Sequence, residues 1–280
     1  MKLKQRLAIG YIQTKFRVLS LLSKRKTAEK AFVAFTTPYI RAMKKTVPAN
    51  AEKISFVFNG LTIRGYRWNH PQRRKALILH GFGSAAYKFE YYAGALARAG
   101  YEVLAFDAPA HGESDGKTVN AVVYGEMIRA ASERFGPFDS FLAHSFGGLA
   151  ISLALEQMPH PAGTKVVLIA PATETTSAID GAFATLRISD PEIRRLFDNR
   201  IFELTGKAPS WYSVGRAIQD IGADVLWVHD ENDDITPWAD AEKVQEQRLP
   251  HVRFLVTKGL GHQKIYHDTR VKNEIISFLS

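Results

Sequence analysis

A serine, an aspartate and a histidine stand at three separate points of the chain, each shortly after an apolar run. Ser145 lies in Ala-His-Ser-Phe-Gly-Gly, Asp233 lies in His-Asp-Glu-Asn-Asp-Asp-Ile-Thr-Pro, and His262 ends Gly-Leu-Gly-His. A serine hydroxyl becomes a nucleophile when a histidine removes its proton, and a carboxylate can hold that histidine in the correct tautomer. These residue types therefore predict acyl-transfer chemistry if the fold brings the three side chains together.

The serine and the acid each have alternative interpretations. Small residues two positions before and after a serine are typical of a sharp strand-to-helix turn that exposes the hydroxyl, and Ala143 stands where glycine is usual. The same serine, Ser145, could instead be the N-cap of a helix. Asp230 and Asp234 compete with Asp233 for the role of the acid.

Three further histidines stand beside glycines or beside the serine. His80 opens His-Gly-Phe-Gly-Ser, and His111 lies in Asp-Ala-Pro-Ala-His-Gly-Glu-Ser. Both are expected to organise their turns, and His144 is expected to point away from the pocket. The histidines do not have the spacing of metal ligands and the chain has no cysteine, so neither a metal nor another cofactor is predicted.

The elements that must position these residues follow one another regularly in residues 51–280. Asn59-Gly60 between two strand patterns predicts a hairpin. Apolar runs that alternate with helical patterns then predict an α/β fold, a mostly parallel sheet with helices on both faces. Strands are expected at 54–58, 61–68, 76–79, 101–106, 140–143, 165–170, 224–229 and 252–256, and helices at 87–98, 119–135, 147–157, 238–247 and 268–279. The candidate residues follow strand ends, where such sheets bind ligands.

The interval 172–221 breaks this alternation. It is far longer than a crossover helix requires and too apolar for a solvated loop, so it is predicted to form a small inserted helical cap. Tyr87, Phe89, Tyr91 and Tyr92 lie near the turn after the third strand. They are expected either to line an apolar acyl pocket or to pack the cap against the body.

In order and in strand context, these motifs resemble those of the α/β-hydrolase-fold serine hydrolases, a family of esterase- and lipase-like proteins. The resemblance covers roughly residues 54–280. It implies that Ser145, Asp233 and His262 are the nucleophile, acid and base of a catalytic triad. It also implies that the cap is inserted in the interval already noted, because the family commonly carries its cap there.

The resemblance assigns the oxyanion hole to the backbone N–H groups of Phe82 and Phe146. A serine at the turn argues against the dehalogenase and epoxide-hydrolase branches, which carry aspartate there. The activity implied is hydrolysis of a small-molecule carboxylic ester or thioester with a small to medium apolar acyl group, through an acyl-enzyme on Ser145. A non-catalytic hydrolase-fold ligand-binding protein and a membrane-surface lipid hydrolase are the alternatives.

The net charge of +9 belongs to the N-terminal segment, residues 1–50, which holds twelve lysines and arginines and one acid. Residues 51–280 hold 25 basic and 27 acidic residues, so no nucleic-acid partner is predicted for the body. Apolar residues at helical spacing, Ala8, Ile12, Phe16 and Leu19, predict an amphipathic helix. That helix could pack on the body, lie on an anionic membrane surface, or belong to a targeting segment.

No apolar run reaches the length of a membrane span. Lys15 and Arg17 interrupt the apolar stretch near the N-terminus, and no small-residue cleavage site follows it. A cytoplasmic location is therefore expected, with peripheral membrane contact through residues 1–50 as the alternative.

Overall fold

The structure is a computed structural model that describes residues 3–38, 46–161 and 163–280, with side chains from residue 10 onward. Residues 1–2 and 39–45, which belong to the predicted N-terminal segment, lie outside the described residues. The described chain forms two compact units. Of the described residues, the larger unit comprises 38, 46–161, 163–173 and 213–280, and the smaller comprises 3–37 and 174–212.

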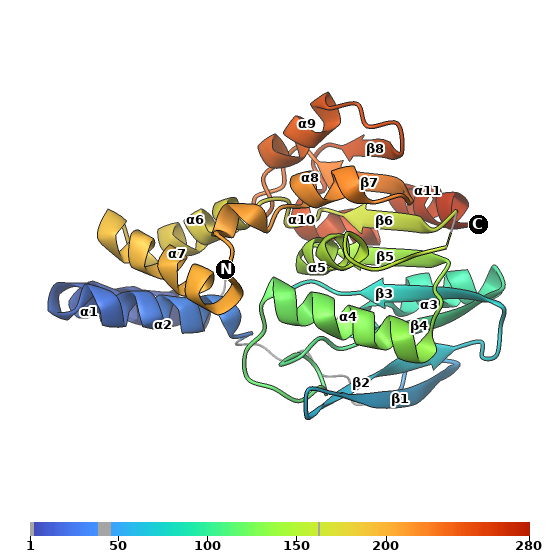
Figure 1. The fold of residues 1–280 in the computed structure, drawn as a ribbon, viewed down its shortest axis with the longest axis horizontal. Coiled ribbons are helices and arrows are strands. Elements are labelled where there is room, and N and C mark those ends of the chain that lie inside the picture. Colours follow the sequence, from blue (N-terminus) through green and yellow to red (C-terminus); the bar gives the residue numbers. More distant parts are fainter. Residues whose placement is uncertain (1–2, 39–45, 162) are drawn as a thin grey trace. The chain divides into compact units, whose positions relative to one another are not determined.

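The larger unit is built on one eight-stranded sheet. Its strands are β1 (Ala51–Phe58), β2 (Leu61–Trp68), β3 (Arg74–Leu79), β4 (Tyr101–Phe106), β5 (Ser140–His144), β6 (Lys165–Ile169), β7 (Asp224–Asp230) and β8 (Val252–Thr257). They lie in the order β1-β2-β4-β3-β5-β6-β7-β8, so the sheet is open (Figure 1). The pairs β1–β2 and β2–β4 are antiparallel and all others are parallel, which confirms the predicted mostly parallel sheet.

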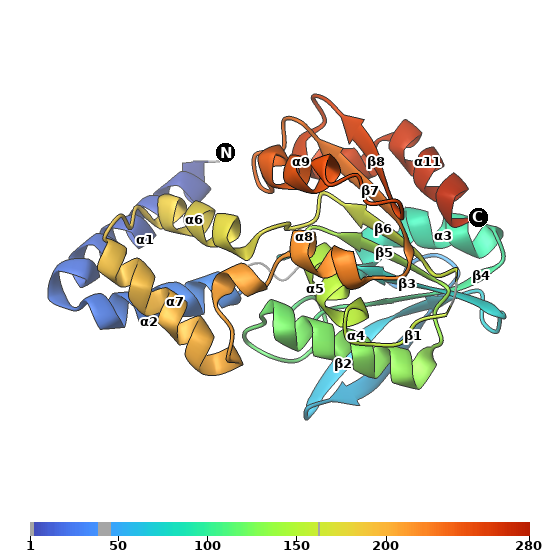
Figure 2. The ribbon, with the colours of Figure 1, turned by 45° about the horizontal axis from the view of Figure 1, so that its top comes forward.

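Helices cover both faces of this sheet, as predicted. The helices of the larger unit are α3 (Glu90–Arg98), α4 (Ala121–Phe135), α5 (Phe146–Leu155), α8 (Val214–Ala217), α9 (Trp238–Glu246), α10 (Gly261–Lys264) and α11 (Thr269–Leu279). α3 and α11 pack on one face, and α4 and α5 lie on the other (Figures 1 and 2). The central strands are buried on both faces, which explains their continuous apolar runs.

Some boundaries differ from those that the sequence predicted. α4 begins at Ala121 because the side chain of Asn120 caps it and accepts a hydrogen bond from the N–H of Val123. The helix expected at 87–98 divides into a 3-10 turn, Ala86–Phe89, and α3. The short helix α10, which carries His262, was not predicted.

The smaller unit consists mainly of four helices, α1 (Leu3–Leu22), α2 (Lys24–Thr36), α6 (Thr175–Leu186) and α7 (Pro191–Thr205). Its centre is aromatic: the ring of Phe197 on α7 lies 5.8 Å from that of Phe32, 5.7 Å from that of Phe35 and 5.2 Å from that of Phe183. The N-terminal helices therefore pack on helices of the long interval. The domain boundary at residue 50 and the cap limits of 172–221 stay predictions.

Candidate active site

Ser145 occupies a sharp turn between β5 and α5. Its φ of 55° and ψ of −118° lie in a region that non-glycine residues rarely adopt, and its N–H donates to the carbonyl of Ile169 at 3.0 Å. Ser145 occupies the N-cap position of α5, as the alternative interpretation held, but its side chain makes no capping hydrogen bond to the helix. The turn instead directs the hydroxyl toward a histidine.

Close backbone contacts explain the small residues after the serine. A β carbon at Gly147 would lie 2.8 Å from the carbonyl oxygens of Leu79 and His80. A β carbon at Gly148 would lie 2.7 Å from the side chain of Pro171. The turn can therefore approach β3 and the loop after β6 only with glycine at these two positions.

Gly147→Ala is expected to lower the free energy of unfolding by about 2 kcal/mol, because the new methyl group meets backbone oxygens that cannot move aside. The matched control is Gly94→Ala in α3, where the nearest atom would be an arginine nitrogen at 3.6 Å. That change should stabilise the protein by up to about 1 kcal/mol. Urea unfolding of both variants measures the difference, and equal stabilities would contradict the crowding argument.

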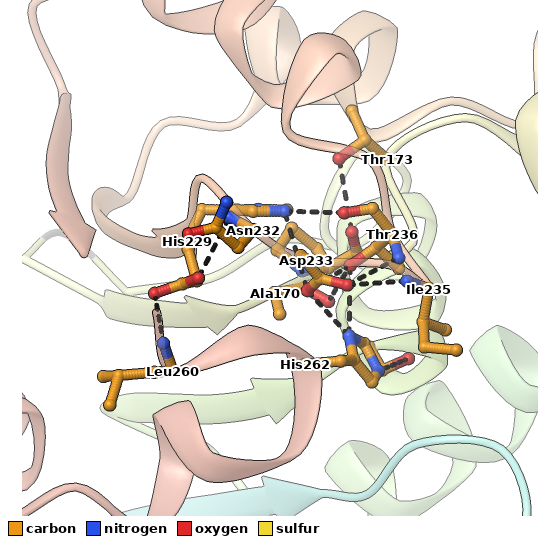
Figure 3. A network of polar contacts seen from close by, with 12 residues as sticks. Ala170, Thr173, His229, Asn232, Asp233, Ile235, Thr236, Leu260 and His262 are labelled. Atoms are coloured by element: carbon orange, nitrogen blue, oxygen red, sulfur yellow. Dashed lines mark hydrogen bonds and ion pairs between the residues drawn. The ribbon is translucent and has the colours of Figure 1, made fainter. Parts of the chain in front are cut away.

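The structure brings Ser145, Asp233 and His262 together from the segments that follow β5, β7 and β8. His262 Nε2 lies 3.0 Å from Ser145 Oγ. His262 Nδ1 lies 2.8 Å from Asp233 Oδ2 (Figure 3). Each of the three residues is 8% exposed. Because a carboxylate oxygen can only accept, Nδ1 carries the proton toward Asp233, and Nε2 faces the serine hydroxyl as an acceptor.

Asp233 is held as an ion by its surroundings. Its Oδ1 accepts from the N–H groups of Ile235 and Thr236, each at 2.9 Å. Burial acts to raise the pKa of Asp233, but the hydrogen bond and charge of His262, followed by those two N–H groups, outweigh it and leave the pKa below its usual value. Asp233 can therefore stabilise a protonated histidine at neutral pH.

The two competing acids lie elsewhere. Asp230 accepts hydrogen bonds from the Thr257 hydroxyl at 2.7 Å and from the N–H of Leu260 at 3.0 Å. It thus holds the loop that leads from β8 to His262. The Asp234 side chain is exposed at the surface. Of the three aspartates that the sequence left open, the structure places Asp233 against the histidine.

Thr236 is a site residue that the sequence analysis missed. Its hydroxyl lies 2.9 Å from Asp233 Oδ2, 3.2 Å from His262 Nδ1 and 3.3 Å from the carbonyl of Ala170 (Figure 3). The available signal was an aspartate followed three residues later by threonine, a pattern in which the carboxylate binds the following N–H groups. Thr236 is therefore a positioning residue for the acid and the histidine.

Thr236→Val is expected to lower kcat/KM for an ester about tenfold with little change in KM, because Asp233 loses a hydrogen bond donor beside His262. Thr257→Val is the matched control, since Thr257 makes the same kind of bond to Asp230 away from the histidine. Steady-state kinetics should show the kcat effect for Thr236→Val alone. Equal loss in both variants would indicate a purely structural role.

His229 holds the backbone of the segment after β7 that carries Asp233 and Thr236. The indole N–H of Trp227 donates to His229 Nδ1 at 3.3 Å, and His229 Nε2–H donates to the carbonyl of Thr236 at 2.9 Å. The residue is fully buried, and burial lowers its pKa. His229 therefore stays neutral and fixes the backbone at the positioning threonine.

His144 contacts His262, and its orientation away from the pocket stays a prediction. Its ring lies 4.8 Å from that of His262, and its Nε2–H donates to the His262 carbonyl at 3.3 Å. Within the described residues its buried Nδ1 has no hydrogen-bond partner. Burial and, after it, the charge of His262 lower the pKa of His144 to about 3. The His144 side chain is therefore neutral and packs against His262.

His80 and His111 organise the loops around the serine, as expected. His80 Nδ1–H donates to the carbonyl of Gly81 at 2.8 Å, while its Nε2 accepts from the N–H of Ala108 at 2.9 Å. His111 Nε2 accepts from the N–H of Gly83 at 2.9 Å. Burial lowers the pKa of His80 to about 4, so its neutral form joins the turn after β3 to the loop after β4.

The turn after β3 also lies against Ser145. A β carbon at Gly81 would be 3.0 Å from Ser145 Cβ, and the rings of Phe82 and Phe146 lie 5.7 Å apart, edge to face. The backbone N–H groups of Phe82, in the turn after β3, and of Phe146, at the start of α5, are the predicted oxyanion donors. Their assignment to an oxyanion hole stays a prediction.

The aromatic residues of the 3-10 turn Ala86–Phe89 and of α3 lie partly in the core and partly at the surface. Phe89 and Tyr92 are buried in the core of the larger unit, where Phe89 stacks on Tyr266 at 5.5 Å. Tyr91 is half exposed, with the ammonium of Lys272 3.7 Å from its ring centre. Phe89 and Tyr92 therefore stabilise the fold.

No metal centre is evident in the part of the chain that the structure describes. Among those residues, no group of three or more His, Cys, Asp or Glu side chains is placed to hold a metal ion. None of the described helices has the length and apolar content needed to cross a membrane.

Comparison with known proteins places this geometry in context. Residues 70–207 match a family model for hydrolases described as serine aminopeptidase, S33. No curated protein matches the sequence.

Solved structures share the fold at low sequence identity. An esterase of Pyrococcus furiosus superposes with a TM-score of 0.65 and 16% identity, over 87% of this chain and 97% of that one. The α/β hydrolase GrgF from Penicillium sp. sh18 gives 0.60 and 19%, over 82% and 97%. The thioesterase domain from the curacin biosynthetic pathway gives 0.60 and 14%, over 82% and 98%. The shared fold is the α/β-hydrolase fold, and residues 70–207 are similar to the hydrolases of the matched family.

Proposed function

We propose that the protein is a serine hydrolase that cleaves a carboxylic ester or thioester through an acyl-enzyme on Ser145. The observation that carries this proposal is the unbroken chain of hydrogen bonds from Ser145 Oγ through His262 to Asp233. The fold that the chain shares with hydrolases supports hydrolysis as the general reaction. Two structural neighbours named as an esterase and a thioesterase domain support esters and thioesters as the substrate classes.

In the first half of the reaction, His262 Nε2 takes the hydroxyl proton as Ser145 Oγ attacks the carbonyl carbon. The carbonyl oxygen becomes an oxyanion, to which the N–H groups of Phe82 and Phe146 would donate; one such donor typically contributes about 3 kcal/mol. The carbon–oxygen or carbon–sulfur bond then breaks, and His262 returns its proton to the leaving alkoxide or thiolate. Asp233 stabilises the positive charge that the imidazole carries between these events.

In the second half, water replaces the leaving group. His262 removes a proton from the water, whose oxygen attacks the acyl carbon, and the proton then passes to Ser145 Oγ as the acid is released. Aromatic rings border the serine: Phe82 is 41% exposed and packs edge-on against Phe146. This apolar wall supports an acyl group that is itself apolar.

The test is labelling of the full chain with a fluorophosphonate, followed by mass spectrometry of the adduct. We expect the adduct on Ser145, together with hydrolysis of p-nitrophenyl esters or acyl thioesters of short to medium chain length. A folded protein that forms no adduct would favour the alternative of a non-catalytic ligand-binding protein. If the protein hydrolyses aminoacyl amides but neither esters nor thioesters, it would be a peptidase instead of an esterase or thioesterase.

A further inference from the structure

The smaller unit exposes an unusual share of large apolar side chains. Of the twelve strongly exposed ones in the described chain, seven lie in this unit, at Tyr11, Val18, Leu21, Leu22, Val33, Phe202 and Leu204. Leu21 and Leu22, where α1 meets α2, are 83% and 77% exposed. Scattered exposed apolar residues need no explanation, but a concentration of them marks a surface that contacts something.

Helical spacing places several of these side chains on one face of α1. Tyr11, Val18 and Leu22 are separated by seven and four residues, so they project in similar directions. Phe16 lies on the opposite side and is buried. The inner face of α1 therefore packs within its own unit, while its outer face presents exposed apolar side chains.

Basic side chains share this outer surface. Residues 10–38 contain six lysines and arginines and one acid, Glu29, which pairs with Arg25 at 3.2 Å. Lys15 is exposed between Tyr11 and Val18 on the outer face of α1. On α2, Lys26, Lys30 and Val33 are all exposed at helical spacing, so cations and apolar groups alternate there as well.

We propose that the outer surface of α1 and α2, formed by Tyr11, Lys15, Val18, Leu21, Leu22, Lys26, Lys30 and Val33, docks peripherally on a bilayer that contains anionic phospholipids. The leucines, valines and tyrosine would enter the boundary between headgroups and acyl chains, and the lysines would meet the phosphates. A nucleic acid would engage the cations but offers little to exposed leucines and valines, so the mixture favours lipid. This docking is independent of the proposed hydrolytic activity.

The test is sedimentation of the full chain with vesicles of phosphatidylcholine, alone or mixed with phosphatidylserine. Wild-type protein should bind the mixed vesicles, more weakly at high salt, and bind pure phosphatidylcholine poorly. Leu21→Ser with Leu22→Ser should weaken binding about tenfold without changing the charge. Val57→Ser is the matched control, because Val57 is 72% exposed on β1 of the other unit and should bind as the wild type does.

Three results would overturn the proposal. One is failure of the folded wild-type chain to bind the mixed vesicles, and another is equal binding by the wild type and the double leucine variant. The third is a dimer in sedimentation velocity that the leucine substitutions dissociate, which would assign the surface to a second copy of the chain. If the wild-type chain does not bind the mixed vesicles but binds single-stranded RNA tightly, and the leucine substitutions leave RNA binding unchanged, the basic residues would instead serve a nucleic-acid partner.

Discussion

Ser145→Ala is expected to reduce kcat/KM for any ester that the protein cleaves by about 10⁴-fold or more, because no other group can form the acyl-enzyme. The substitution removes a single oxygen atom, and alanine tolerates the positive φ no worse than serine does. Thermal unfolding should therefore stay close to that of the wild type. Steady-state hydrolysis of a p-nitrophenyl ester, with fluorophosphonate labelling of the same preparation, measures the effect.

Ser152→Ala provides the matched control. Ser152 is buried on α5, and its hydroxyl donates to the carbonyl of Gly148 at 2.9 Å without reaching His262. Its removal should leave labelling and kcat near the wild-type values. A Ser145→Ala protein that keeps about a tenth of wild-type activity would show that another group performs the chemistry.

Asp233→Asn is expected to lower kcat about 10⁴-fold while the chain remains folded. An amide at this position cannot stabilise the protonated imidazole, and its NH₂ group can donate to Nδ1 and so favour the wrong tautomer.

The pH dependence of stability follows from the same contacts of Asp233. Because the folded-state pKa of Asp233 is lowered, its charge stabilises the fold above about pH 4, and that contribution is lost as the pH falls through the folded-state pKa.

Asp230→Asn should have the opposite balance of effects. Its carboxylate accepts from the Thr257 hydroxyl and from the N–H groups of Asn232, Gly259 and Leu260, and an amide has only one oxygen to offer them. We expect a loss of roughly 1–3 kcal/mol in the free energy of unfolding, with a smaller loss of kcat than in Asp233→Asn. Urea unfolding and ester hydrolysis of the two variants measure both effects. A larger loss of kcat in Asp230→Asn than in Asp233→Asn would identify Asp230 as the acid.

The order of strands and helices follows from local patterns in the chain. Continuous apolar runs mark the strands that are buried on both faces, and Asn59-Gly60 marks a hairpin whose two central residues have positive φ. The motif around Ser145 predicts the sharp turn, because only small residues permit its approach to β3. These features depend on residues that are close in sequence, so pattern and residue type are sufficient to predict them.

Other features depend on contacts between distant residues, which no local pattern encodes. The residues alone left Asp230, Asp233 and Asp234 open and the resemblance implied Asp233, whereas the structure shows its 2.8 Å contact with a histidine 29 residues away. The packing of His144 on His262 joins residues 118 positions apart.

The partners of the N-terminal helices were likewise decided only in three dimensions, where Gln13 donates to the carbonyl of Thr185. The sequence by itself determined the fold class and the residue types of the site. The tertiary structure decided which side chains touch, because hydrogen bonds and packing form only where the loops from separate strands converge.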